Sequence, residues 1–477
     1  MPYYGIVGSV VYNMNKTEKT EDKMSKIVSF AKRKGFVFPS SEIYGGFAGV
    51  YDFGPLGVEL ENNLKAQWWR RMVHDRDDIV GLDSSISMSP RIWEASGHTT
   101  GFSDPLAECK ECNTRIRVDK VLESIGVFAD EKMSEEEINK LFDDNKDKIK
   151  CPSCGKQDFT DARKFNLLVK SNLGDFSGDM SDPAYLRGET CQGIYVNFKN
   201  VVDSMRMKLP FGIAQIGKAF RNEISPRQFI FRGREFEQME MQYFTEPADE
   251  MKEYEKLKEY RWNAILELGI DEKNLRWKQH ENLVFYAKDA WDIEYNYPWG
   301  FDEMEGVHAR GNYDLTAHSK GCGKPQEYHN QETGEKFIPH IIESSGGVGR
   351  LLFAILCDAY TEDELGGESR VFMKFKPSIA PVKAAVFPLL KNKPDLVKKA
   401  REVYVDLKKD VPQIMWDDNG NVGKRYRRQD EIGTPFCITI DFETLEDEAV
   451  TVRDRDTGEQ QRMDIGELSD YIKNNIK

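Results

Sequence analysis

One segment of the chain, residues 220–244 with the sequence FRNEISPRQFIFRGREFEQMEMQYF, constrains the fold more than any other. The residues just before it, 211–220, are mostly apolar and indicate a buried strand. Residues 224–233 contain Ser225-Pro226 and a glycine, which are typical of a loop. After the loop, polar and apolar residues alternate over 238–243, as on a strand with one buried face. The segment therefore predicts an antiparallel hairpin.

The polar residues of this hairpin are mostly arginine and glutamate. The charged face is expected to hold Arg221, Glu223, Arg232, Arg234, Glu235 and Glu240. Planar guanidinium groups can each bind two phosphate oxygens, whereas carboxylates among them suit an ammonium or amino-group donor. The alternative is a solvated hairpin whose charges form only surface ion pairs.

FRNE, a loop and then FRGREFEQME resemble motif 2 of the class II aminoacyl-tRNA synthetases, and specifically of the dimeric glycyl-tRNA synthetase family. The resemblance extends from about residue 34 to residue 477. It implies an α+β fold with an antiparallel catalytic sheet flanked by helices. It also implies ATP-dependent ligation of glycine to tRNA(Gly) through a glycyl-adenylate, with ATP and Mg²⁺, by a homodimer.

At 477 residues the chain is long enough for two or three domains. We expect an N-terminal extension at 1–23, which is polar and lacks helical periodicity, although Met24 is an alternative start. The catalytic domain is expected at 24–376, with an insertion at about 104–164. Strand, helix and strand patterns near 384–390, 396–407 and 436–441 predict a small α/β domain over 377–477, which by resemblance binds the anticodon.

Composition favours a cytoplasmic protein. The formal net charge of −14 argues against a general nucleic-acid binder but allows local basic contacts with tRNA. No apolar run approaches the roughly 20 residues of a membrane span, and no basic region precedes the short apolar stretch at 6–11. The eight cysteines fit a reducing compartment better than a disulfide scaffold.

Two C-x-x-C pairs lie in the expected insertion, at Cys109/Cys112 and Cys151/Cys154. Four thiolates complete the tetrahedral shell of a structural zinc ion and leave no open position for catalysis. The spacing between the pairs requires that a helical segment be looped out. The alternative is four reduced cysteines without metal.

Apolar residues recur every fourth position after Pro55, at Leu60, Leu64, Trp68 and Met72, and predict an amphipathic helix. A long helix led in by Gly-Pro resembles motif 1, the dimer-forming element of class II enzymes. An ordinary core helix would have the same periodicity.

Further segments resemble the family's glycine-binding motifs. RIRVDK resembles R-A-D-x-L and implies that Arg117 contacts the amino acid, although a surface arginine is the alternative. LRGETCQG resembles L-R-P-E-T-A-Q-G, with Gly188 in place of proline, and implies that Glu189 binds the α-ammonium group. The glycine-binding residues implied by resemblance are Arg117, Glu189, Phe236, Glu237, Gln238, Met239, Glu240, Glu343, Ser344, Ser345, Gly346 and Gly347.

IIESSGGVGRLLFAIL resembles motif 3, whose arginine meets the terminal phosphate of ATP and is here Arg350. By resemblance Arg221 neutralises the α-phosphate, Glu223 accepts from the adenine amino group, and Glu303 and Glu343 hold Mg²⁺. The ATP-binding residues implied are Arg221, Asn222, Glu223, Phe231, Arg232, Gly233, Arg234, Glu235, Phe236, Glu303, Met304, Gly347, Val348, Gly349 and Arg350. The sequence departs from the family pattern at Ala309, where an acid is expected, and at Ser344, where proline is usual.

KRYRRQDEIGTPFCITID resembles the anticodon-binding domain of several class II synthetases. Its basic cluster predicts an RNA backbone contact through Lys424, Arg425, Arg427 and Arg428. A basic helix start balanced by Asp430 and Glu431 is the alternative. Two rival functions remain at this point, a synthetase for another amino acid such as threonine or proline, and a non-catalytic synthetase-like RNA-binding subunit.

Overall fold

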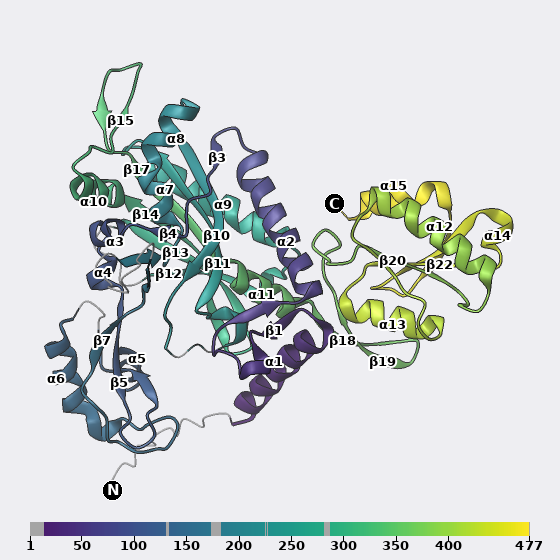
Figure 1. The fold of residues 1–477 in the computed structure, drawn as a ribbon, viewed down its shortest axis with the longest axis horizontal. Helices are drawn as coiled ribbons and strands as arrows, with labels where there is room; N and C mark the ends of the chain where they lie inside the picture. Colours follow the sequence, from purple (N-terminus) through teal and green to yellow (C-terminus); the bar gives the residue numbers. More distant parts are fainter. Residues whose placement is uncertain are drawn as a thin grey trace, which may run out of the picture.

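The computed structural model describes residues 14–129, 133–172, 183–224, 226, 228–280 and 287–476. A seven-stranded sheet forms the centre of the larger part, with strand order β12-β13-β14-β17-β11-β10-β3 (Figure 1). All neighbours pair antiparallel except β3 with β10. The strands span β3 Ile79–Gly81, β10 Phe211–Phe220, β11 Glu235–Thr245, β12 Leu275–Gln279, β13 Asp289–Tyr297, β14 Gly300–Gly311 and β17 His340–Gly347.

The hairpin predicted around 220–244 is confirmed. Phe211 of β10 lies opposite Phe244 of β11, and Phe220 lies opposite Glu235. Between the strands, Phe229–Phe231 form a short 3₁₀ helix. Ser225 of the loop lies outside the described residues.

Three helices cover one face of the sheet: α2 Pro55–Trp69, α9 Glu250–Leu266 and α11 Val348–Ala359. The apolar stripe predicted for α2 is confirmed, because Leu60, Leu64 and Trp68 are buried in the main core. Met72 is buried in the π-helical turn that follows. The sequence pattern therefore identified the helix and the side that it buries.

The helix α1, Met14–Lys34, begins inside the segment expected as a loose extension. That expectation is wrong for the end of the extension, and residues 1–13 lie outside the described residues. Ile27, Phe30 and Ala31 pack α1 against the main core, so tertiary burial stabilises this helix.

The insertion has its own sheet and core. Strand β5, Ser103–Glu108, lies between β6, Arg115–Arg117, and β7, Arg163–Asn166. The helices α5 Val118–Ser124 and α6 Glu135–Asn145 are looped out between the cysteine pairs, as predicted. Ser134 and Glu137 form a capping box at the start of α6.

The C-terminal part forms a separate lobe of the ribbon (Figure 1). Its sheet has the order β21-β20-β22-β23-β24, with β20 Ala384–Pro388 parallel to both of its neighbours. The predicted strands and helix are confirmed as β20, β22 Phe436–Ile440 and α12 Pro394–Asp410. The other elements are β21 Ile414–Trp416, β23 Ala449–Asp454, β24 Gln460–Asp464, α13 Val422–Ile432, α14 Thr444–Asp447 and α15 Ile465–Asn475.

Shorter elements complete the fold around the central sheet. They are β1 Val37–Pro39, β2 Tyr51–Phe53, β4 Ser87–Met88, α3 Pro90–Ala95, α4 His98–Gly101, β8 Val169–Asn172, β9 Pro183–Leu186, α7 Cys191–Val196, α8 Phe198–Met205, α10 Tyr313–Cys322, β15 Tyr328–His329, β16 Lys336–Phe337, β18 Tyr360–Leu365 and β19 Glu368–Met373. Within the described ranges, no helix has the length and apolarity needed to cross a membrane.

Candidate active site

The face of the central sheet opposite α9 and α11 carries polar side chains from neighbouring strands. On β11 the residues Gln238, Glu240 and Gln242 point to this face, because successive side chains of a strand alternate. Ser345 Oγ of β17 donates to Glu240 Oε1 at 2.7 Å, and Gln242 Nε2 donates to Glu343 Oε2 at 2.9 Å. The pairing of β11 with β17 thus joins two predicted motifs into one site.

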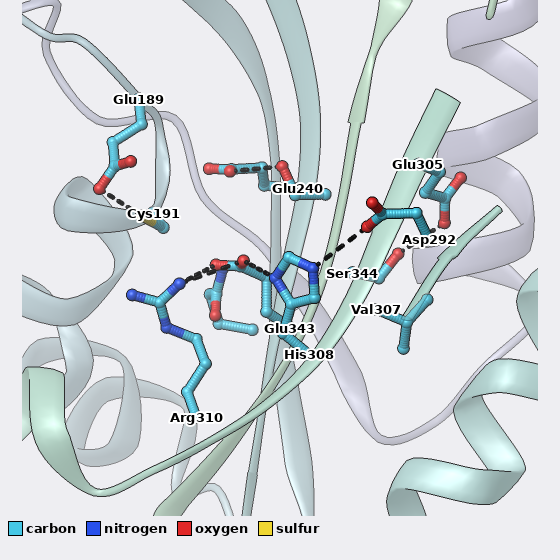
Figure 2. Close-up of polar contacts among 12 residues, drawn as sticks. Glu189, Cys191, Glu240, Asp292, Glu305, Val307, His308, Arg310, Glu343 and Ser344 are labelled. Carbon is cyan, nitrogen blue, oxygen red and sulfur yellow. Dashed lines mark hydrogen bonds and ion pairs between the residues drawn. The ribbon is translucent and has the colours of Figure 1, made fainter. Parts of the chain in front are cut away.

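The carboxylates of Glu189, Glu240 and Glu343 converge in this region (Figure 2); those of Glu240 and Glu343 are buried, and the Glu189 side chain is 19% exposed. Glu189 precedes α7, and its carboxylate accepts from Gln192 Nε2 at 2.9 Å and lies 3.1 Å from His98 Nε2. Glu240 accepts from the Thr190 hydroxyl as well as from Ser345. The group therefore concentrates negative charge where little water can enter.

The three acids differ in charge. Burial, with the neighbouring charges of Glu343 and Glu189, raises the pKa of Glu240 to about 7. Burial also opposes ionisation of Glu343, but Arg310 and His308 lower the pKa of Glu343 to about 2. In the same way His98 and Arg310 hold the pKa of Glu189 well below its ordinary range, against the effect of burial. Glu189 and Glu343 are therefore ionised at neutral pH, whereas Glu240 is present in both its protonated and its ionised form.

Arg310 lies beside this group, with its Nη1 3.1 Å from Glu343 Oε2 (Figure 2). Its other nitrogens bind Asp314. Arg310 and His308 also bind Asp314 and Asp292, so these two cations do not balance the three carboxylates. The site therefore has the electrostatic character that a small ammonium group requires.

Two arginines lie beyond the acids, beside aromatic rings. The guanidinium of Arg221 lies between the rings of Phe102 and Phe236, 5.1 and 5.2 Å from their centroids, and Arg221 Nε donates to the Gly188 carbonyl at 3.0 Å. Arg350, at the start of α11, lies 4.6 Å from the ring of Phe231, and its Nη1 is 2.8 Å from Glu303 Oε1. Stacking fixes both planar groups in orientations that suit phosphate oxygens.

Comparison with known proteins agrees with this geometry. The family model "tRNA synthetase class II core domain (G, H, P, S and T)" matches residues 175–359, and the model "Anticodon binding domain" matches residues 383–475. A glycine–tRNA ligase of Clostridium acetobutylicum is 51% identical over 468 residues, which cover 96% of this chain and 100% of the relative. Those of Borreliella burgdorferi and Caldanaerobacter subterraneus subsp. tengcongensis are 50% and 47% identical, each over 95% of this chain and 98% of the relative.

This chain belongs to the glycine–tRNA ligase family. The central antiparallel sheet is its class II synthetase core, and the C-terminal lobe is its anticodon-binding domain. The fold class inferred from the sequence is thereby confirmed. The relatives also decide against a synthetase for threonine or proline.

Three residues expected in the glycine site of this ligase family member face the opposite side of the sheet. Glu237 points toward α2, where it binds Lys65 Nζ at 2.9 Å, and Met239 is buried in the main core. Ser344 donates to the buried Glu305 at 2.9 Å. The prediction is therefore wrong for their side chains, because a run of adjacent strand residues alternates between faces. Gly346 and Gly347, next to Ser345, contribute backbone only.

Arg117 does not join the acids either. It binds Asp104 at 3.0 Å and Asp119 at 2.6 Å within the insertion, and its charge acts on Glu223 rather than on the acid group. These partners place Arg117 beside the loop of the β10–β11 hairpin. The ion-pair partners of Arg117 are thus Asp104 and Asp119 rather than the acids expected at glycine.

The two residues expected at Mg²⁺, Glu303 and Glu343, do not lie together. Glu343 lies opposite His308 of β14, whereas Glu303 lies several residues earlier on that strand. At about 3.3 Å per residue the two positions are roughly 15 Å apart along the strand. A bulge in β14 between them leaves Met304 in the core and turns Glu303 toward Arg350.

The other expected ATP residues lie around the hairpin and the start of α11. Arg234 Nε donates to the Glu223 carbonyl at 2.7 Å, and the backbone N–H of Asn222 donates to the Leu167 carbonyl at 2.8 Å. Glu235 points away from the site toward Lys218, and Val348 is buried in the core. The charge of Arg232 acts on Asp104 of β5. A side chain on Gly233 or Gly349 would clash with nearby carbonyl oxygens, so both glycines allow close backbone packing.

The sequence did not identify several residues that surround the acids. They are His98 at the start of α4, Gln242 of β11 and Arg310 of β14. Cys191 donates its thiol to Glu189 at 3.1 Å. Periodicity on β11 could have indicated Gln242, whereas His98 and Arg310 come from distant segments.

The four cysteines of the insertion form one cluster. Cys109 and Cys154 Sγ are 3.6 Å apart, Cys112 and Cys151 Sγ are 3.5 Å apart, and all four sulfur atoms lie within 4.8 Å of one another. Tetrahedral zinc with bonds of about 2.3 Å requires sulfur atoms roughly 3.8 Å apart. The geometry fits such an ion.

The basic cluster of the C-terminal lobe is divided between interior and surface. Arg425 is buried and donates to the carbonyls of Pro388, Asp418 and Gly420, so its assignment to tRNA is wrong. Lys424 is exposed, whereas Arg428 binds Asp417. Arg427 donates to Glu368 and to the Ser369 carbonyl.

Proposed function

We propose that this chain ligates glycine to tRNA(Gly) in two steps and that the buried acids bind the substrate ammonium group. The convergence of Glu189, Glu240 and Glu343 beside Arg221 carries this proposal. In the first step the glycine carboxylate attacks the α-phosphate of ATP. A carboxylate–phosphate bond forms, the bond to the β-phosphate breaks, and pyrophosphate leaves. In the second step a hydroxyl of the terminal adenosine of tRNA takes the glycyl group, and AMP leaves.

The chain's own residues act by orientation and electrostatics. The glycine carboxylate is already ionised, so the first step needs no side-chain base. Arg221 stabilises the charge that develops at the α-phosphate, and Arg350 binds the phosphates that leave. The ring of Phe236, which lies beside the Arg221 guanidinium, stacks on the adenine. The family uses Mg²⁺, which neutralises phosphate charge, and Glu303 offers it a carboxylate beside Arg350.

Selection of glycine is a matter of exclusion, because glycine has no side chain for a pocket to recognise. Thr190 and Ser345 both donate to Glu240, and Gln238 lies 3.3 Å from it. These contacts form a hydrogen-bonded wall beside the ammonium position. We propose that this wall leaves no volume for a Cβ.

Exchange of labelled pyrophosphate into ATP tests the function. We expect exchange that depends on glycine, with a kcat/KM for alanine lower by at least about a hundredfold, near the upper limit for one methylene. A non-catalytic RNA-binding subunit would show no exchange with either amino acid. Alanine within tenfold of glycine would contradict the wall formed around Glu240.

Glycine binding should improve as the pH rises through neutrality. The carboxylate form of Glu240 binds an ammonium group, and the pKa of Glu240 is raised to about 7. From about pH 6 to about pH 8 the ionised fraction of Glu240 rises roughly tenfold, so the KM for glycine should fall by about the same factor. Pyrophosphate exchange at saturating ATP measures it. Glu240→Gln should remove this dependence; the same slope in the variant would assign it to another group.

Further properties are part of the proposal. The four-cysteine cluster holds a structural zinc, and the absence of disulfides among the eight cysteines, all described, supports a cytoplasmic location. The apolar side chains of Ile43, Tyr44 and Phe47 are exposed, which supports a homodimer that covers them. Lys424, Arg427 and Arg428 contact tRNA. The domain limits at 376 and about 104–164 are proposed as predicted from the sequence, whereas the limit predicted at 23 falls inside α1.

A further inference from the structure

A second cluster of metal-ligating side chains lies beside the acid group. It consists of His280, Asp292 and His308, whose nearest ring nitrogens and carboxylate oxygens lie within 4.8 Å of one another. His280 Nε2 is 2.7 Å from Asp292 Oδ2, and His308 Nε2 is 3.4 Å from Asp292 Oδ1. Figure 2 shows His308 between Asp292 and Glu343. The proposed synthetase chemistry uses neither His280 nor Asp292.

Three neighbouring strands bring these residues together. His280 follows the last residue of β12, Asp292 lies in β13, and His308 lies in β14. Asp292 pairs directly with Gly306, two residues before His308 and on the same face. A Cβ at position 306 would lie 2.7 Å from His308 Nε2 and 3.3 Å from Asp292 Oδ1. Glycine there keeps the space beside both ligand atoms open.

We propose that His280, Asp292 and His308 bind a divalent transition-metal ion of the zinc type. Two imidazoles and a carboxylate suit such ions. Bonds of about 2.0–2.2 Å at tetrahedral angles place ligand atoms roughly 3.4 Å apart, close to the separations found here. Three protein ligands leave at least one position for water.

The surroundings of the cluster support a built site. His308 Nδ1 lies 3.1 Å from Glu343 Oε1, so a carboxylate accepts from the ring nitrogen that the metal would not use. Such outer carboxylates orient ligating histidines and raise their basicity. The His280 side chain is 37% exposed, whereas that of Asp292 is 11% exposed, so an ion can enter past His280.

The ion would link the His280, Asp292 and His308 cluster to the acid group. By fixing the His308 ring it would hold the hydrogen bond to Glu343, which the proposed function places at the substrate ammonium group. This consequence depends on that function, but binding of the metal does not. The competing interpretation is a metal-free network in which both ring nitrogens of His308 donate to carboxylates.

Metal content of the full-length protein tests the proposal. After equilibration with Zn²⁺ and removal of free ion, we expect two zinc ions per chain by mass spectrometry, one in the cysteine cluster and one here. His280→Ala and Asp292→Asn should each retain one. His329→Ala, which removes an exposed histidine outside the cluster, should retain two. In titrations, loss of a ligand should weaken the second site by more than the about 10–100-fold that loss of an outer partner costs.

Substitution of the bound zinc by Co²⁺ provides a second test, because the absorption spectrum of Co²⁺ reports the type of ligand and does not rely on metal content alone. The second ion should add absorption without a thiolate-to-metal band, and His280→Ala should remove only that part. One zinc per chain in the wild-type protein, with no further Zn²⁺ uptake in titration, would overturn the proposal and favour the metal-free network. Loss of pyrophosphate exchange with intact metal content would instead count against the proposed function alone.

Discussion

Replacing Arg221 with alanine should lower kcat/KM for glycine-dependent pyrophosphate exchange by about 10²–10³-fold, comparable to the loss of one preorganised donor to a developing negative charge. The rings of Phe102 and Phe236 hold the guanidinium in place, and the Gly188 carbonyl accepts from its Nε. Its other nitrogens can therefore face phosphate oxygens without a cost in side-chain ordering. Most of the loss should appear in kcat, because the α-phosphate gains charge in the transition state.

Two variants make this result specific. Arg221→Lys keeps the positive charge but loses the planar fork and the stacking, so we expect it to recover only a small part of the activity. Arg33→Ala removes an exposed arginine of α1 and should leave exchange unchanged. Exchange by Arg221→Ala within tenfold of wild type would refute the assigned role.

The largest effect on stability is expected for Arg261→Ala, at about 3–5 kcal/mol. Arg261 of α9 is fully buried and binds Glu305 of β14 through Nε and, at 2.9 Å, through Nη2. Removing the guanidinium leaves Glu305 in the core, with Ser344 as a remaining donor. Urea unfolding followed by tryptophan fluorescence measures the loss.

A double variant separates charge from volume. Arg261→Met with Glu305→Gln removes both charges and keeps similar side-chain volumes, so it should be much closer to wild type than Arg261→Ala. Equal destabilisation of the two proteins would show that packing, and not an uncompensated charge, determines the effect.

Local pattern predicted the elements of this fold but not all of its side-chain directions. Alternation on β11 and the four-residue period of α2 follow from chain geometry, and both are confirmed. A motif that is taken as a continuous run of strand residues includes both faces of the strand. For this reason Glu237 and Ser344 were assigned to the glycine site although their side chains face the opposite side of the sheet. Arg425 was misassigned for a related reason: a helix turns by about 100° per residue, so Arg425 points inward although Lys424 beside it is exposed.

The remaining parts of the site depend on which distant segments pair. His308 and Arg310 reach Glu343 because of the register between β14 and β17, which no single segment encodes. The bulge at Met304 likewise has no signal in the sequence, yet it sets the direction of Glu303. His98 was invisible for the same reason, because its partner Glu189 is supplied by another part of the chain.

The short helix α4 has a consequence for how the enzyme can be altered. It begins with His98, which contacts Glu189, and is followed by Phe102, which stacks on Arg221, before the chain enters β5 of the insertion. One turn therefore contacts both Glu189 and Arg221, the residues to which the proposed function assigns glycine and ATP. A displacement of the insertion that moves α4 would disturb the contacts of His98 with Glu189 and of Phe102 with Arg221 together. An exchange of the insertion between homologues should therefore preserve activity only when α4 and Phe102 keep these contacts.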